Sequence, residues 1–341
     1  MRILVGLSGG LDSTYTAYNL KNEGHSVEGL VLVMHDYTDV SAAQKTADLL
    51  GIKLNILDCR ELFQKYVVSN FISEYSSGRT PNPCTVCNRY VKMAELCRFA
   101  RENSFDKAAT GHYARICYDE EKDRYCIRKG ADERKDQSYM LWHLTQEQLK
   151  MLYLPLCDTT KEQIREEARS SPFAYLSDAK ESQEICFIPD NDYASYIEKE
   201  KGVFPEGDFV DSDGKKIGRH KGIIHYTIGQ RKGLGISLGA PAYITKIDPE
   251  KNTVTVEKQS DVKSNALVAT CLNSQLLPVD DGCEYILDVK IRYAARPMKA
   301  RVLIEGQKAR VEFTDSVRAI TPGQSAVFYQ DGLIAFGGVI I

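Results

Sequence analysis

The N-terminal part of the chain alternates short apolar runs with segments of helical periodicity, and this alternation constrains the fold more than any other feature. The apolar runs occupy residues 2–7, 27–34 and 52–57. The segments between them carry apolar stripes at helical spacing, and Gly24 and Gly51 stand where each helix should end. This βαβ rhythm predicts an α/β, doubly wound parallel sheet with helices on both faces.

Beyond residue 200, turn-forming clusters alternate with strand-like runs. The runs with the clearest period of two are 253–257, 285–291, 309–313 and 325–329. A chain of 341 residues also exceeds the roughly 250 to 300 residues at which a single core usually stops growing. We therefore expect an α/β domain over 1–200, a small β-rich domain over 201–258 and a C-terminal β-barrel over 259–341.

Composition excludes several classes of protein. With 43% apolar and 27% charged residues, the chain resembles an ordinary globular protein rather than a disordered or collagen-like one. No apolar stretch approaches the roughly 18 residues that a membrane helix needs, and the first residues do not read as a leader. In a reducing compartment, the ten cysteines are expected to be buried residues, metal ligands or reactive thiols rather than structural disulfides. We expect a cytoplasmic protein that does not engage membranes.

Two basic runs lie in the β-rich half, although the formal charge of the whole chain is -3. Residues 214–247 and 290–301 contain no Asp or Glu. Such runs can neutralise the phosphates of a nucleic acid, or they can be solvated basic faces. Within the first run, we expect Gln230, Arg231 and Lys232 to contact nucleic acid.

A glycine-rich turn, Ser8-Gly-Gly-Leu-Asp-Ser13, follows the first predicted strand and opens the first predicted helix. Free backbone N–H groups and the helix dipole favour an anion such as phosphate at this position. Asp12 can hold a divalent cation, Mg²⁺, against the phosphates. The alternative is a plain strand-to-helix turn in which Asp12 and Ser13 serve as caps.

A second helix is expected to begin after Asn82, with Pro83 at its first position. Its predicted apolar stripe comprises Val86, Tyr90, Met93, Cys97 and Ala100. Cys84 and Cys87 share another face of the first turn, where the helix dipole should lower their pKa values. The pair therefore suggests reactive or metal-bound sulfur, or else two packed cysteines beneath a cap. We expect the cysteines other than these two and Cys186 to be packed residues: Cys59, Cys97, Cys117, Cys126, Cys157, Cys271 and Cys283.

The glycine-rich turn resembles the pyrophosphate-binding loop (PP-loop) of N-type ATP pyrophosphatases, which adenylate a carbonyl oxygen and release pyrophosphate. Six further blocks resemble, in order, those of the tRNA-specific 2-thiouridylase family (MnmA/TrmU). They are RTPNPCTVCN from Arg79, ATGHY from Ala109, KDQSY from Lys135, EICFI from Glu184, YTIGQRKGLG from Tyr226 and TPGQSA from Thr321. The resemblance implies ATP-dependent 2-thiolation of the wobble uridine (position 34) of tRNA through an adenylated uridine, with ATP and Mg²⁺ required.

The resemblance also implies roles for particular residues. Cys87 matches the nucleophile and Cys186 the cysteine that carries a persulfide, and the two can form a disulfide after sulfur leaves. The implied ATP-binding residues are Gly6, Leu7, Ser8, Gly9, Gly10, Leu11, Asp12, Ser13, Leu32 and Gly111. Asn82, Pro83 and Cys84 should face the target base. The implied tRNA contacts are His112, Lys135, Asp136, Gln137, Arg292, Tyr293 and Gln324. Without the resemblance, His112 reads as a structural residue and 135–137 as a solvated loop.

Cys84 departs from the family pattern, because many members carry an Asp there that is proposed to assist proton transfer. Cys84, Cys87 and Cys186 instead form a set that could hold a [4Fe-4S] cluster with one iron open to sulfide. Otherwise sulfur would arrive as a persulfide. The expected donor is a cysteine desulfurase, a sulfur relay protein or free sulfide.

Two other functions fit parts of the sequence. One is another PP-loop reaction, ATP-dependent amidation, which the reactive cysteine set and the absence of a glutaminase-like domain disfavour. The other is a non-catalytic, nucleotide-dependent RNA-binding protein, which the basic β-rich half would serve equally well.

Overall fold

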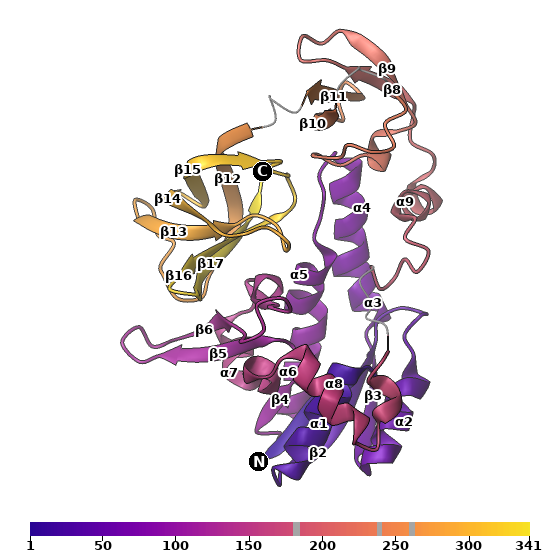
Figure 1. The fold of residues 1–341 in the computed structure, drawn as a ribbon, viewed down its shortest axis with the longest axis vertical. Helices are drawn as coiled ribbons and strands as arrows, with labels where there is room; N and C mark the ends of the chain where they lie inside the picture. The colour runs from indigo at the N-terminus through magenta and orange to yellow at the C-terminus, as the bar shows by residue number, and fades with distance from the viewer. Residues whose placement is uncertain (180–184, 237–240, 259–262) are drawn as a thin grey trace.

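The computed structural model describes residues 1–179, 185–236, 241–258 and 263–341 (Figure 1). Its N-terminal part is built on a parallel sheet in the order β3-β2-β1-β4-β7. These strands are β1 (Arg2–Gly6), β2 (Ser26–Val33), β3 (Lys53–Asp58), β4 (Lys107–Ala109) and β7 (Leu152–Tyr153). The predicted parallel α/β fold is confirmed.

Helices cover both faces of this sheet, because alternate residues of β1 point in opposite directions. Ile3 and Val5 pack in one apolar cluster with residues of α1, α2 and α8, whereas Leu4 packs in another with residues of α4 and α6. The helices are α1 (Leu11–Asn22), α2 (Val40–Leu50), α3 (Arg60–Phe63), α4 (Ser69–Ser76), α5 (Pro83–Cys87), α6 (Met93–Glu102), α7 (Gln146–Met151), α8 (Lys161–Arg169) and α9 (Tyr193–Lys201). Short 3₁₀ turns lie at Ser138–Leu141, Pro155–Asp158, Ala174–Leu176 and Ile223–His225.

The order of the strands reverses at β1, which pairs with β2 on one side and β4 on the other. The loops that follow β1 and β4 therefore leave the same edge of the sheet in diverging directions. In open α/β sheets, ligands bind in the crevice at such a switch point. The glycine-rich turn follows β1, and Gly111 and His112 follow β4.

The cysteine-bearing helix is irregular, because a π-helical turn (Asn88–Lys92) joins α5 to α6; a similar turn (Gln64–Val68) joins α3 to α4. The predicted stripe is correct within α6, but Tyr90 is 39% exposed, and Cys87 and Val91 are buried instead. The wider π turn rotates the buried face relative to an ideal helix. Within α5 itself, Cys87 is buried and Cys84 is exposed.

The C-terminal part is a closed antiparallel β-barrel in the order β12-β15-β14-β13-β16-β17, with β12 pairing back to β17. Its strands are β12 (Lys263–Ser274), β13 (Glu284–Lys290), β14 (Met298–Glu305), β15 (Lys308–Arg318), β16 (Ser325–Gln330) and β17 (Leu333–Ile340). The predicted barrel is thus confirmed. A hairpin from the α/β region, β5 (Ala114–Asp119) and β6 (Arg124–Lys129), extends this sheet through pairing of Arg128 with Leu333. The barrel and the α/β region therefore share a sheet.

Between these parts in sequence comes a small sheet in the order β10-β11-β8-β9, which lies at the end of the molecule away from the parallel sheet (top of Figure 1). Its strands are β8 (Gly207–Val210), β9 (Lys216–His220), β10 (Ala242–Asp248) and β11 (Thr253–Lys258). The strand content expected beyond residue 200 is confirmed. Within the described residues, no helix is long and apolar enough to cross a membrane.

Candidate functional site

One cavity of about 850 Å³ lies at the switch point of the parallel sheet and joins the glycine-rich turn to the three singled-out cysteines. The predicted residues that line it are Ser8, Gly10, Leu11, Asp12, Ser13, Pro83, Cys84, Cys87, His112, Lys135, Gln137, Cys186 and Tyr293. The structure thus brings together groups from five separate segments of the chain, within 8–13, 83–87, 112–137, at 186 and at 293.

The other predicted residues lie around this cavity or away from it. Five residues lie in the strands and turns next to the cavity but do not line it: Gly6, Leu7, Gly9, Leu32 and Gly111. Asn82 precedes α5, and its amide Nδ2 donates to Met140 Sδ at 3.6 Å. Glu184, the first residue of the block that contains Cys186, lies outside the described residues.

The glycine-rich turn is compact because two glycines allow close backbone approach. Gly9 has a φ of +78°, and a Cβ there would stand 2.6 Å from Ala42. A Cβ on Gly111 would stand 2.8 Å from the carbonyl carbon of Asp12, so the loop after β4 packs against the first turn of α1. Gly10 is the N-cap of α1 and makes no side-chain capping bond. Asp12 and Ser13 therefore do not cap this helix from the N-cap position, contrary to the alternative interpretation.

The two serine hydroxyls of the turn interact with each other. Ser8 Oγ lies 3.1 Å from Ser13 Oγ, and the Ser8 backbone N–H donates to Ser13 Oγ at 3.2 Å. Ser13 Oγ also donates to the Gly10 carbonyl at 3.1 Å. These bonds hold the turn in a closed shape at the N-terminus of α1, where a helix favours anions.

Asp12 binds a lysine that was not anticipated. Its Oδ1 accepts from Lys161 Nζ and from the Tyr113 hydroxyl, each at 2.6 Å. The Lys161 side chain is only 6% exposed. The sequence did hold a signal for it, because Lys161 occupies the buried stripe of α8 together with Ile164 and Ala168. The glycine-rich turn thus has a buried lysine beside it.

The Mg²⁺ expectation rests on the same carboxylate. Asp12 is the single acidic side chain among the described residues that line the cavity. Mg²⁺ that accompanies a nucleotide commonly needs only one or two carboxylates besides the phosphates. The donor set therefore suits nucleotide-bound Mg²⁺, provided that the phosphates supply the remaining ligands.

The three thiols differ from expectation in their acidity. Burial raises the pKa values of the Cys84 and Cys87 thiols, and it raises the pKa of Cys186 to about 11. The predicted lowering of the first two by the helix dipole is wrong, because loss of hydration outweighs it. The nearby Lys92 ammonium acts in the opposite direction on all three pKa values. Cys87 Sγ also contacts Met34 Sδ at 3.7 Å.

The same three thiols are the candidate ligands of an iron–sulfur cluster. All three line the cavity and are reduced. Across the described ranges, however, no group of three or more Cys, His, Asp or Glu side chains stands close enough together to hold a metal ion. The described arrangement does not fit a preformed cluster site.

Most of the remaining cysteines are packed, as predicted. Cys59, Cys97 and Cys126 are buried, and Cys117, Cys157 and Cys283 are partly buried. Cys271 is exposed, with a left-handed φ of +52°, so the prediction of packing is wrong there. It lies where the pairing of β12 with β17 is irregular, which turns its side chain away from the barrel core.

His112 lies in the cavity wall as an uncharged ring. Its Nδ1 lies 2.8 Å from Thr110 Oγ1. Burial, followed by repulsion from Lys92, lowers the pKa of His112 to about 3. His112 can therefore contact RNA through a neutral hydrogen bond but not as a cation at neutral pH.

Residues 135–137 do not form the plain solvated loop that their sequence suggests in isolation. Asp136 is buried, and its carboxylate accepts from the backbone N–H and the hydroxyl of Ser138 at 3.0 and 2.9 Å. Gln137 Oε1 accepts from the Tyr113 backbone N–H at 3.0 Å. Lys135 and Gln137 line the cavity, whereas Asp136 points into the protein interior.

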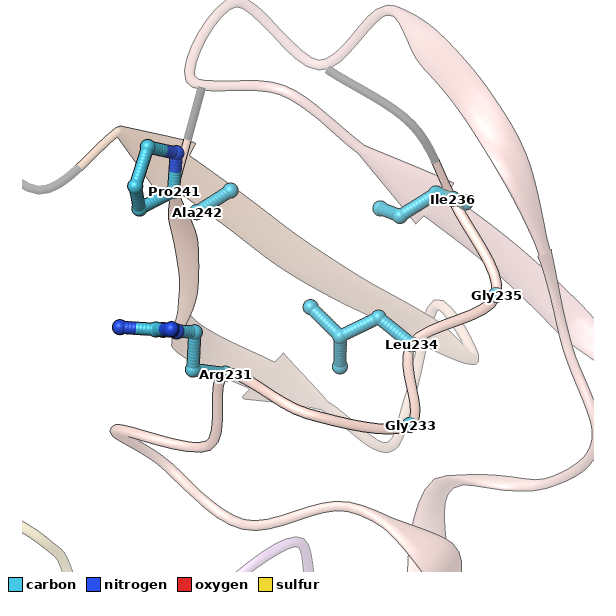
Figure 2. A pocket seen from close by; sticks show the side chains of 7 residues that line it. All are labelled: Arg231, Gly233, Leu234, Gly235, Ile236, Pro241 and Ala242. Atoms are coloured by element: carbon cyan, nitrogen blue, oxygen red, sulfur yellow. The ribbon is translucent and has the colours of Figure 1, made fainter. Parts of the chain in front are cut away.

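The predicted tRNA contacts in the β-rich half are spread over two places. Tyr293 reaches the main cavity. Arg231 instead borders a separate hollow of about 290 Å³ in the small sheet, where its side chain points away from Leu234 (Figure 2). Gln230 Oε1 accepts from the Thr227 backbone N–H, and its Nε2 donates to the Lys232 carbonyl. Arg292 and Gln324 both bind backbone carbonyls within the protein.

Comparisons with known proteins cover almost the whole chain. Residues 1–190 match the family described as tRNA methyl transferase HUP domain, 194–258 the tRNA methyl transferase PRC-barrel domain, and 274–341 the aminomethyltransferase beta-barrel domain. The tRNA-specific 2-thiouridylase MnmA of Acetivibrio thermocellus is 42% identical over 99% of both chains. The tRNA-specific 2-thiouridylase MnmA 1 of Caldanaerobacter subterraneus is 44% identical over 99% of this chain and 97% of its own.

Solved structures show more distant likeness. The U34-tRNA thiolase NcsA of Methanococcus maripaludis with its [4Fe-4S] cluster is 18% identical, with a TM-score of 0.35 over 59% of this chain and 67% of its own. A 4-thiouridine synthetase–RNA complex with bound ATP is 17% identical, with a TM-score of 0.37 over 58% of this chain and 50% of its own. The full-length matches at more than 40% identity decide the classification: the chain belongs to the MnmA family of tRNA-specific 2-thiouridylases.

Proposed function

We propose that the chain catalyses ATP-dependent 2-thiolation of the wobble uridine of tRNA. The observation that carries the proposal is the single cavity in which an anion-binding turn, a buried lysine and three cysteines meet. Such a cavity would let a nucleotide phosphate and a sulfur nucleophile reach adjacent atoms, O2 and C2, of one uridine. Family membership supports the same reaction.

The first chemical step activates an inert carbonyl. Uridine O2 attacks the α-phosphorus of ATP, the bond from that phosphorus to the bridging oxygen breaks, and pyrophosphate leaves with the N3 proton passing to solvent. The N–H groups of the turn and the Lys161 ammonium stabilise the charge on the departing pyrophosphate. Mg²⁺, held by Asp12 and the phosphates, would neutralise part of the same charge.

The second step replaces the activated oxygen. The terminal sulfur of a persulfide on Cys186 attacks C2, and AMP leaves with the former uridine oxygen. The Cys87 thiolate then attacks Cys186 Sγ, forming a Cys87–Cys186 disulfide and leaving the outer sulfur on C2 as the thiocarbonyl. A thiol reductant resets the disulfide. Lys92 favours both sulfur anions, because its charge opposes the effect of burial on the thiol pKa values.

Cys84 has no carboxylate with which to move the N3 proton. We assign it a place beside the target base with Pro83, since both line the cavity. The arrangement of the described cysteines does not support the alternative in which a [4Fe-4S] cluster delivers sulfide, so the proposed steps involve no cluster. The persulfide sulfur would come from the persulfide of a cysteine desulfurase or of a relay protein; free sulfide would supply it by attacking Cys186 Sγ of the Cys87–Cys186 disulfide, which leaves the persulfide on Cys186 and releases the Cys87 thiolate.

The tRNA would bind across all three domains, which we divide at 1–200, 201–258 and 259–341. Lys135 and Tyr293 line the cavity and would flank the extruded nucleotide, while the basic runs would contact phosphates. A cytoplasmic location follows from this substrate.

The test combines unmodified tRNA, ATP, Mg²⁺ and a sulfur donor, with nucleoside mass spectrometry to detect 2-thiouridine and a separate assay for AMP. We expect both products from the unaltered chain. Cys87→Ser and Cys186→Ser should abolish 2-thiouridine while tRNA affinity changes less than about twofold, because neither thiol carries charge at pH 7. The exposed Cys271→Ser is the matched control and should retain full activity.

The outcomes separate the alternatives. An amidating enzyme would consume ATP and ammonia without needing tRNA and would form no 2-thiouridine. An RNA-binding module would yield neither 2-thiouridine nor AMP. Full turnover by Cys186→Ser would show that the sulfur route is wrong.

A further inference from the structure

The loop between β15 and β16 of the barrel, residues 319–324, binds the backbone that leads into the cysteine helix. The Gln324 side-chain Nε2 donates to the Thr80 carbonyl at 2.9 Å and to the Pro81 carbonyl at 3.1 Å. The Thr80 backbone N–H in turn donates to the Pro322 carbonyl at 2.8 Å. Three hydrogen bonds thus join segments that are more than 240 residues apart in sequence.

The approach of the two backbones is too close for a side chain on the barrel side. Gly323 has a φ of +88°, and a Cβ there would stand 2.8 Å from the Thr80 carbonyl oxygen. Both the left-handed conformation and the contact therefore require glycine. The hydrogen bonds of Gln324 belong to a built interface rather than to a chance contact of one flexible side chain.

The held segment is the entrance to the helix that carries the thiols. Pro81 is followed by Asn82, the N-cap of α5, whose side chain makes no capping bond and reaches Met140 instead. A helix start without its own side-chain cap leaves backbone donors unpaired and frays readily. The barrel supplies the restraint that the N-cap does not. Cys84 and Cys87 lie within the first turn beyond it.

The same loop is tied on its other side to the small sheet. Arg292 Nη2 donates to the carbonyls of Ala319 and Ile228 at 2.8 and 3.3 Å, and it contacts Thr321 Oγ1. A Cβ on Gly229 would stand 2.8 Å from the Cβ of Ala319. The loop therefore lies between the basic segment that contains Gln230 and the start of the cysteine helix.

We propose that Gln324 is a positioning residue that fixes the start of the cysteine helix, and that through it the barrel holds Cys84 and Cys87 against the cavity. This inference rests on the proposed function only for its effect on sulfur transfer. Because both amide hydrogens of Gln324 are directed at protein carbonyls, its main role is internal rather than as a contact to tRNA. The positioning itself can be measured without any reaction.

The experiment compares Gln324→Met, which keeps the length and removes the donors, with Gln324→Glu, which keeps the shape and cannot donate when ionised. The control is Gln307→Met, since Gln307 is exposed in the turn between β14 and β15 of the same barrel. Thermal melts verify that each variant folds. Hydrogen exchange is then measured on peptides spanning residues 82–92 of the free protein.

Both Gln324 variants should exchange roughly tenfold faster or more at the first turn of the helix, because two hydrogen bonds are lost. The control should not change. At saturating tRNA the single-turnover thiolation rate of both variants should fall about tenfold, while tRNA affinity changes less than about threefold.

A contact to a tRNA phosphate predicts a different pattern. Gln324→Glu would then weaken tRNA binding far more than Gln324→Met, with the rate at saturation and the exchange of 82–92 unchanged. That result, or unchanged exchange in Gln324→Met by itself, overturns the proposal. If the unaltered protein forms no 2-thiouridine, the proposed function fails, and the exchange measurement on the free chain still decides the role of Gln324.

Discussion

The thiol of Cys186 should react slowly with a disulfide reagent such as dithiodipyridine, and its rate should keep rising well above pH 9. Burial raises its pKa to about 11, so at pH 8 only about one thiol in a thousand is ionised, against about one in four for an ordinary cysteine. The higher pKa also makes the thiolate intrinsically more nucleophilic, which raises its reaction rate roughly tenfold and offsets part of this loss. The net expectation is a rate roughly twentyfold below that of a free cysteine.

The assay follows the Cys186 peptide by mass spectrometry after timed exposure of the free protein between pH 7 and 10, with N-acetylcysteine as reference. The logarithm of the rate should rise with unit slope over that whole range. A rate that levels off below pH 9 would refute the argument, because it would mean that the site stabilises the thiolate. Lys92→Met should slow Cys84, Cys87 and Cys186 by a further two- to tenfold or so, because the Lys92 ammonium lowers their pKa values and its removal lets those pKa values rise.

Three further predictions concern stability. Lys161→Met should lower the free energy of unfolding in urea by about 1 to 2 kcal/mol, which is less than for a fully buried ion pair because Asp12 is 35% exposed. A double-mutant cycle with Asp12→Asn should show coupling between the two residues, and strictly additive effects would contradict the pairing. Ser325→Ala should cost about 1 to 3 kcal/mol and lower Tm by a few degrees, because it leaves the buried Trp142 indole N–H, now bonded at 2.9 Å, without an acceptor; Ser325→Thr should largely restore Tm. Burial raises the pKa of Cys126 to about 12. The thiol therefore contributes fully to the free energy of unfolding below about pH 8.5, and above that pH this contribution falls by up to about 1.4 kcal/mol per pH unit, because the unfolded chain ionises first. In Cys126→Ala the free energy of unfolding should fall less steeply at alkaline pH, and an equally steep fall would show that Cys126 is not the cause.

The parallel sheet could be predicted because its signal is local. Each strand is a short apolar run and each helix a stripe with a period near 3.6, so the alternation is visible in any window of the sequence. The glycine-rich turn could be predicted for the same reason, since strand, turn and helix adjoin. The buried stripe of the cysteine helix could be predicted only in part, because the π turn at Asn88–Lys92 shifts the face without a distinctive sequence signal.

The parts that could not be predicted depend on long-range contacts. Lys161 meets Asp12 across 149 positions, and Gln324 meets Thr80 across 244. No periodicity connects such positions. The residues of the site that belong to sequence blocks could be named in advance, but whether Gln324 would face a ligand or another segment of the chain could be seen only in the structure.

The acidity of the thiols and the placement of the turn follow from one requirement of the proposed reaction. An adenylated uridine in contact with water would be hydrolysed back to uridine and AMP, so the cavity has to exclude water from C2. Partial exclusion of water also removes some of the hydration that stabilises a thiolate, which accounts for the raised pKa values of all three cysteines, although Cys84 and Cys186 keep exposed surface in the free protein. A single cation shared by these thiols compensates in part without admitting solvent, and Lys92 in the cavity wall has that position. A site that instead lowered the thiol pKa values through hydration would activate sulfur at the expense of the intermediate that sulfur must attack.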